Sequence, residues 1–290
     1  MCIAYCLSTP HKTILRSAPF ESYTADLLQS AFRVVDCMSA YNNTLGVLVA
    51  NAVINSYPTT VAAPVVRAIT RDVKRYMVLA AEADNQRILP VGVSSPHRPS
   101  LIRCQFEYFS AGDEKEAIDF FSVRKFEDTP IPIFFSEYGA KLHASGRLFA
   151  ETRAILSSYM TDTFSGGIVY GFFEAIQGYG LVKRHEDGSI EKLPDFNNLR
   201  ESVQACAELK HNTSLEAPAG CETEVADFNQ WWKAKPEIPE SPLDWDEVRE
   251  QVEDRQWVDV GDEMLDLQVE DLAASVWQRF RIDGTGPRLD

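Results

Sequence analysis

The sequence predicts an α/β fold, and more narrowly an incomplete (β/α)8 barrel of the TIM type. Apolar runs of strand length alternate with longer stretches of helical periodicity, which is the pattern of βα units and a parallel sheet. The apolar run 130–135 is followed by Ser136, Glu137, Tyr138 and Gly139. A carboxylate at the end of a buried strand is typical of the catalytic mouth of a barrel, although such an acid can also meet solvent or cap the next helix.

The expected elements follow one another from residue 2 to residue 173. Short apolar runs predict strands at 2–7, 45–50, 88–93, 119–123, 131–135 and 168–173. Apolar side chains at helical spacing predict helices at 23–41, 63–83 and 147–163. These strands are fewer than a closed barrel has, so open sheet edges are expected, and they favour self-association.

Charge divides the chain into a nearly neutral part and an acidic tail. Residues 1–210 contain 23 acidic and 21 basic side chains, whereas residues 211–290 contain 20 and 7, together with all five tryptophans. We therefore predict a barrel domain at 1–210 and a tail at 211–290. Within 244–281 the tail has apolar positions such as Val248 and Val252 at helical spacing, so it forms either amphipathic acidic helices or a partly disordered, solvated segment.

Composition argues against several classes of protein. The net charge of −15 provides no basic footprint for nucleic acid and opposes binding to anionic membranes. The six cysteines and five histidines show no metal-binding spacing, so free thiols and no metal are expected. Neither end reads as a signal peptide or a lipid-anchor signal, which predicts an intracellular protein if the sequence is complete.

Two motifs resemble a known family. Residues 50–55 read Ala-Asn-Ala-Val-Ile-Asn and residues 134–139 read Phe-Phe-Ser-Glu-Tyr-Gly. They are similar to Gly-Asn-Glu-Val-x-Asn and Phe-Phe-Ser-Glu-Tyr-Gly-Cys of the fungal β-1,3-glucanosyltransferases, the glycolipid-anchored surface proteins of glycoside hydrolase family 72. Further segments match in the same order from about residue 3 to about residue 203, among them 41–46, 68–76 and 160–170.

The resemblance implies a fold and an activity. In the family the strand at 2–7 is the third of the barrel, so the first two βα units are expected to be missing here. The family cleaves β-1,3-glucan and transfers one part to another glucan chain with retention, remodelling the fungal cell wall at the cell surface. It implies β-1,3-glucan as the partner and no cofactor.

The resemblance also assigns roles to single residues. Glu137 matches the nucleophile, and Asn51 matches the asparagine that binds the sugar 2-hydroxyl. Ala52 stands where the family has its acid/base glutamate. The aromatic side chains expected to provide sugar-binding surface are Tyr138, Tyr170, Phe172 and Tyr179. Glu174 either reaches the sugar or is loop surface.

Loss of the acid/base predicts an impaired enzyme. A methyl group neither protonates a departing glucan oxygen nor activates an acceptor hydroxyl, and such assistance is worth about 3 to 5 kcal/mol of barrier. The resemblance also implies that about twenty residues, including a substrate-contacting loop, are missing after Phe121, because residues 122–126 lead almost at once to the strand at 131. The alternatives are a non-catalytic glucan-binding or protein-interaction pseudoenzyme, and an incomplete gene model.

Overall fold

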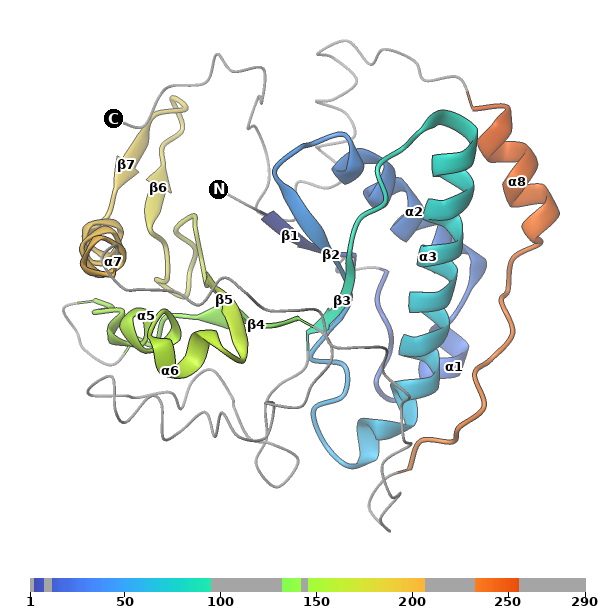
Figure 1. Cartoon of the computed structure of the whole chain (residues 1–290), viewed down its shortest axis with the longest axis horizontal. Coiled ribbons are helices and arrows are strands. Elements are labelled where there is room, and N and C mark those ends of the chain that lie inside the picture. The colour runs from blue at the N-terminus through green and yellow to red at the C-terminus, as the bar shows by residue number, and fades with distance from the viewer. Residues whose placement is uncertain (1–2, 8–11, 95–131, 142–145, 207–232, 256–290) are drawn as a thin grey trace. The chain divides into compact units, whose positions relative to one another are not determined.

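The computed structural model describes residues 3–7, 12–94, 132–141, 146–206 and 233–255 (Figure 1). The chain groups into two compact units. Unit 1 contains residues 1–96 and 227–290, and unit 2 contains residues 97–226. Each unit is described by itself.

Unit 1 contains a parallel sheet with the strand order β1-β2-β3. The strands are β1 (Ile3–Cys6), β2 (Thr44–Asn51) and β3 (Val91–Ser94). Helices α2 (Ala25–Ser39) and α3 (Ala63–Asp84) connect them, preceded by the short α1 (Pro19–Ser22) and the 3-10 helix η1 (Pro58–Ala62). The predicted βα alternation and parallel pairing are thereby confirmed for this part of the chain.

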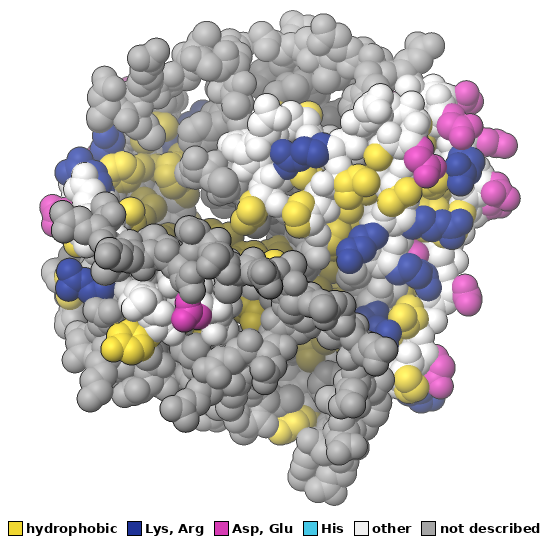
Figure 2. Space-filling model, viewed as in Figure 1, with side chains coloured by type: hydrophobic (Ala, Val, Ile, Leu, Met, Phe, Trp, Pro, Cys, Tyr) yellow, Lys and Arg dark blue, Asp and Glu magenta, His cyan; other side chains and the backbone are white. Residues whose placement is uncertain are grey.

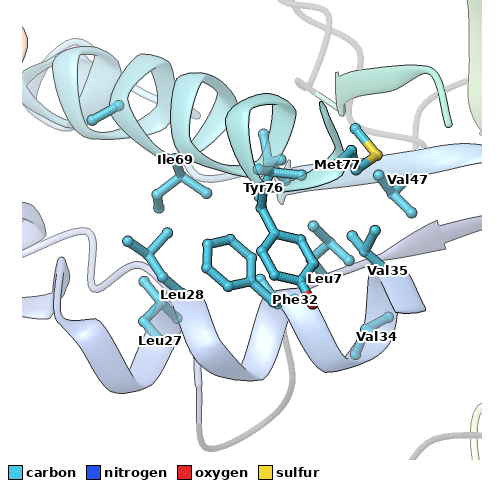
Figure 3. Close-up of a cluster of buried hydrophobic side chains, with 14 of the residues drawn as sticks. Leu7, Leu27, Leu28, Phe32, Val34, Val35, Val47, Ile69, Tyr76 and Met77 are labelled. Carbon is cyan, nitrogen blue, oxygen red and sulfur yellow. The ribbon is translucent and has the colours of Figure 1, made fainter. Parts of the chain in front are cut away.

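The two long helices form for local reasons that the sequence shows. The Thr24 side chain accepts a hydrogen bond from the Leu27 backbone N–H at 3.3 Å and so caps the start of α2. Asn85 ends α3 in the left-handed conformation that asparagine tolerates. Between the helices the rings of Phe32 and Tyr76 stack with centroids 4.0 Å apart (Figure 3).

Strand β3 begins three residues later than the predicted strand 88–93. Leu89 is buried in the core, and the Pro90 carbonyl accepts a hydrogen bond from the Val47 backbone N–H at 2.9 Å. Proline has no N–H to donate, so it precedes the regular ladder with β2 and does not continue it.

A helix from the acidic tail is part of unit 1. Helix α8 (Trp245–Glu253) lies along the outer side of α3 (Figure 1) and buries Val248 and Val252 in the same core. The Arg75 guanidinium lies 4.2 Å from the Trp245 ring centroid. Residues 245–253 therefore form the amphipathic acidic helix, one of the two predicted possibilities. The boundary at residue 210 stays a prediction.

Charge also favours this packing. Acidic side chains gather over α8 and basic ones over the adjoining surface of α3 (Figure 2). At the end of α8, Arg255 forms ion pairs with Asp36 at 2.9 Å and with Asp84 at 2.7 Å. Because these carboxylates belong to α2 and α3, one arginine fastens the tail to both helices.

A second polar cluster holds the segment before α8. Arg71 donates to the Pro239 carbonyl at 3.0 Å and to the Asp72 carboxylate at 2.8 Å. Asp72 is 0% exposed and also accepts a hydrogen bond from the Tyr23 hydroxyl. Burial, with a contribution from Asp72, raises the pKa of Tyr23 well above its usual value.

Unit 2 contains a parallel pair of strands, a hairpin and three helices within its described residues. Strands β4 (Ile133–Tyr138) and β5 (Phe164–Val169) pair in parallel, with α5 (Ala150–Ile155) and α6 (Ser158–Thr161) between them in the chain. Strands β6 (Val182–Arg184) and β7 (Ile190–Lys192) form an antiparallel hairpin, followed by α7 (Pro194–Ala205).

The elements predicted for the described part of unit 2 have different bounds. The strand predicted at 131–135 is observed as β4, which runs from Ile133 to Tyr138. The helix predicted at 147–163 divides at Ser157, whose extended backbone and whose hydroxyl, bonded to the Ala154 carbonyl at 2.7 Å, end α5. The strand predicted at 168–173 begins at Phe164 because that ring is buried against Phe135, with centroids 4.7 Å apart. The hairpin and α7 were not predicted.

The barrel prediction extends beyond the described residues. The predicted strand 119–123 lies outside them, and the incomplete barrel, its open edge and self-association through it stay predictions. None of the helices in the described ranges combines the length with the apolar composition that crossing a bilayer demands.

If α8 belongs to the fold of unit 1, removing its buried methyl groups should destabilise that unit. We expect Val252→Ala to lower the free energy of unfolding by about 1 to 3 kcal/mol. Urea unfolding followed by circular dichroism measures this change. The exposed neighbour Gln251→Ala is the control and should stay within about 0.5 kcal/mol of wild type. Equal stability of all three proteins would contradict the packing role of α8.

The buried phenols predict a loss of stability at high pH. Burial, with a contribution from Asp36, also raises the pKa of Tyr76. Since both folded-state pKa values lie above the unfolded value of about 10, the neutral phenols contribute stability that is complete below about pH 10 and is lost above it. Urea unfolding at pH 8 and pH 11 should show this difference, and the double variant Tyr23→Phe/Tyr76→Phe should show a smaller one. An unchanged free energy of unfolding in the wild type would refute it.

Candidate active site

The first part of the predicted site lies in unit 1, at the carboxyl end of β2. Asn51 is exposed and pairs with Ser94 in the parallel register, after an irregularity in the ladder that follows Leu48. Ala52 continues the contact, because its backbone N–H donates to the Ser94 carbonyl at 3.0 Å. Parallel pairing thus brings the ends of β2 and β3 together at one edge of the sheet.

Ala52 has an unusual backbone conformation. Its φ of 50° lies in the left-handed region, which costs a residue with a Cβ about 1 to 2 kcal/mol. The Arg16 guanidinium donates to the Ala52 carbonyl at 2.8 Å. Two hydrogen bonds from separate segments therefore hold the peptide at the position where the family resemblance places the missing glutamate.

The second part of the predicted site lies in unit 2, at the carboxyl end of β4. Glu137 is half-buried and is the next-to-last residue of the strand. The following carbonyl, of Tyr138, accepts a hydrogen bond from the Tyr170 backbone N–H at 2.9 Å. Glu137 and Tyr170 therefore lie at neighbouring strand ends, as the parallel pairing of β4 and β5 requires.

Tyr138 is buried, whereas a ring that stacks on a sugar needs an exposed face. It is 8% exposed and packs in the hydrophobic core of unit 2, with its hydroxyl 3.3 Å from the Thr152 hydroxyl. Burial raises the pKa of this phenol. Such packing is that of a core residue and argues against sugar stacking.

The loop after β5 carries Glu174 and Tyr179, and both were considered as sugar-binding residues from the sequence. The Glu174 carboxylate accepts a hydrogen bond from the Gly180 backbone N–H at 2.6 Å and so closes its own loop. The rings of Tyr170 and Tyr179 meet edge to face with centroids 5.5 Å apart. Contact of these two rings with a sugar stays a prediction.

The two parts belong to different units. Asn51 and Ala52 are in unit 1, whereas Glu137, Tyr170 and Glu174 are in unit 2. Their convergence on one cleft, and a Glu137 to Ala52 spacing suited to a retaining enzyme, stay predictions. Among the described residues, no group of three or more His, Cys, Asp or Glu side chains is arranged to hold a metal ion.

Comparison with known proteins identifies the family of this chain. It matches the glucanosyltransferase family over residues 1–127 and 122–207, and it belongs to that family. The 1,3-beta-glucanosyltransferase GAS5 of Saccharomyces cerevisiae is 33% identical over 258 residues, which cover 81% of this chain and 52% of that protein. The 1,3-beta-glucanosyltransferase gel1 of Aspergillus fumigatus is 32% identical over 218 residues, covering 68% and 47%.

Solved structures agree with this assignment. Gas2p of Saccharomyces cerevisiae in complex with laminaripentaose superposes with a TM-score of 0.66 at 30% identity, covering 85% of this chain and 59% of that one. This likeness supports the family's fold for this chain, and the βα alternation with parallel pairing supports the α/β class. The chain spans about half the length of the curated relatives it matches.

The backbone of Ala52 leads to a stability prediction. Since glycine adopts a positive φ without a Cβ clash, Ala52→Gly should raise the free energy of unfolding by about 0.5 to 1 kcal/mol. Ala50→Gly is the matched control, because Ala50 is a buried β2 residue and should lose about 1 kcal/mol. Urea unfolding measures both changes. Equal destabilisation by the two glycines would show that position 52 is not strained.

Proposed function

We propose that this protein binds β-1,3-glucan through the site of its family and that its own glucanosyl transfer is strongly impaired. The observation that carries the proposal is the pairing of a retained carboxylate, Glu137 at the end of β4, with an alanine at position 52. A retaining enzyme needs one carboxylate as nucleophile and a second as acid/base. This chain keeps the first position and has lost the second.

Each remaining residue has a defined part in the proposal. Glu137 attacks the anomeric carbon and forms the glycosyl-enzyme ester. The glucan oxygen that departs in this step needs a proton. Asn51 donates to the sugar 2-hydroxyl. Tyr170 and Tyr179 provide aromatic surface for glucose rings. We assign Tyr138 to the core of unit 2, and we assign Glu174 first to loop closure.

The missing acid/base determines which substrates can react. At position 52 a methyl group leaves the departing oxygen without a proton, which costs about a hundred- to ten-thousand-fold in rate. A leaving group that departs without protonation avoids this cost. A glycosyl ester formed in this way then needs a nucleophile, such as azide, that requires no deprotonation.

The same family membership suggests where the protein acts. β-1,3-Glucan is the proposed partner, and the fungal cell wall or cell surface is the proposed location. Neither a metal nor an organic cofactor takes part in the proposed chemistry.

A purely non-catalytic glucan-binding protein is the second candidate. Ala52 favours it, since half of the catalytic pair is missing. The protein-interaction alternative has less support, because the acidic segment 245–253 packs on its own chain and buries its apolar face there.

Transfer assays separate these candidates. With reduced laminari-oligosaccharides we expect no measurable elongation by the wild type, because position 52 supplies no proton. With an aryl laminarioside carrying an activated leaving group, azide should yield a β-glycosyl azide detectable by mass spectrometry, and Glu137→Gln should abolish it. Absence of that product in the wild type would favour the non-catalytic candidate.

Restoring the carboxylate provides the matched control. Ala52→Glu should raise transfer to unmodified laminari-oligosaccharides above the wild type, and Ala52→Glu/Glu137→Gln should show none. Transfer by the wild type on these oligosaccharides that depends on Glu137 would overturn the proposed impairment.

A further inference from the structure

A buried arginine in unit 2 lies directly behind the strand ends of the proposed site. Arg147 is 0% exposed, yet it is not part of any regular element. Its Nη1 donates to the Tyr170 carbonyl at 2.7 Å, and its Nη2 donates to the Tyr179 carbonyl at 2.5 Å. One guanidinium therefore holds the backbone of both tyrosines whose rings meet edge to face.

The guanidinium is itself fixed by an acid on another element. Asp195, in the first turn of α7, accepts from the Arg147 Nε at 2.7 Å and from the Arg147 backbone N–H at 3.0 Å. The Asn198 side chain also donates to the Arg147 carbonyl at 2.9 Å. A buried charge needs such a partner with good hydrogen-bond geometry, so the arginine has little freedom to move.

The same side chain contacts the segment that follows Glu137. A Cβ added to Gly139 would lie 3.1 Å from the Arg147 Nη1 and 3.0 Å from the Phe149 ring. The Gly139 φ of 114° is one that only glycine adopts readily. The backbone after β4 therefore lies close to the Arg147 side chain. In addition, the Tyr138 carbonyl accepts a hydrogen bond from the Tyr170 N–H.

Glu151 adds a second buried charge to this arrangement. It is 5% exposed and accepts a hydrogen bond from the Ala140 backbone N–H at 2.8 Å. Arg147 and Glu151 come from one short stretch of chain, and between them they bind the segments that follow β4 and β5. Neither residue belongs to the site that the family motifs define.

We propose that Arg147, held by Asp195, is a positioning residue that fixes the strand ends carrying Glu137 and Tyr170 for glucan binding. The choice of glucan as the ligand rests on the proposed function. The role of Arg147 in fixing the strand ends does not depend on it. The planar guanidinium reaches the Asp195 carboxylate and both tyrosine carbonyls with separate N–H groups. A lysine keeps the charge but has one compact ammonium, which does not bind three acceptors in these directions.

Laminaripentaose binding and hydrogen exchange of the full chain test the proposal together. For Arg147→Lys we expect the Kd for laminaripentaose, measured by isothermal titration calorimetry, to rise about tenfold or more. Amide exchange should become faster in the peptide 170–181 but stay unchanged in the hairpin 182–192. Asn198→Ala, which removes one contact to Arg147, should shift both readouts in the same direction by less, and it replaces Arg147→Lys if that variant does not fold.

A matched core variant separates positioning from general destabilisation. Met160 is 0% exposed and belongs to the hydrophobic core of unit 2, and it takes part in none of the hydrogen bonds of Arg147. Met160→Ala should lower the Tm while leaving the Kd within about twofold of wild type. Wild-type affinity and exchange in both Arg147→Lys and Asn198→Ala, or equal weakening by Met160→Ala, would overturn the proposal.

The failure of the proposed function has a different signature. If the wild type does not bind laminaripentaose, glucan binding is wrong, and exchange alone decides the positioning role. Faster exchange confined to 170–181 then supports it, and unchanged exchange overturns it.

Discussion

Parallel pairing is the constraint on which the rest of this structure depends. Because neighbouring parallel strands end at the same edge of a sheet, the pairing of β2 with β3 brings Ala52 to Ser94, and that of β4 with β5 brings Glu137 close to Tyr170. Parallel strands also need a crossover between them, and helices supply it in both units. The positions of the candidate site residues at the strand ends therefore follow from the sheet topology. The loops beyond the strands add further residues to the candidate site.

Helix α3, one of the two crossover helices of unit 1, has apolar side chains that need burial on a second side. Helix α3 faces α2 and the sheet, and its Leu79 also belongs to the core in which α8 buries Val248 and Val252. Helix α8, which composition assigns to an acidic tail, therefore buries apolar surface of α3. Acidic side chains gather over α8 beside basic ones of α3 (Figure 2), and two arginines of this segment pair with acids of α3: Arg249 with Glu82 at 3.9 Å and Arg255 with Asp84 at 2.7 Å.

Chemistry and scaffold are separable at position 52. In the proposed function the acid/base carboxylate is a side-chain property, and Ala52 has only a methyl group to offer there. The backbone that would carry it is still fixed by Arg16 and Ser94 in a conformation that alanine adopts at a cost. Arg147 shows the reverse case in unit 2, where a side chain without a chemical role of its own holds the backbone of Tyr170 and Tyr179.

The sequence by itself determined the features that depend on local periodicity and on motif identity. It was sufficient for α2 and α3, for the existence of the strand that carries Glu137 and for the family, because apolar spacing and the Phe-Phe-Ser-Glu-Tyr-Gly run are readable without knowledge of contacts. It also contained a hairpin signal at Asp187-Gly188, where Gly188 has a φ of 85°, although the hairpin was not predicted. Only the tertiary structure decided which side chains are buried: Tyr138 packs in the core, Arg147 and Asp195 pair across 48 residues, and Val252 returns to a core built near the amino terminus. These contacts join residues distant in sequence, and no local pattern encodes which distant partner will bury a given side chain.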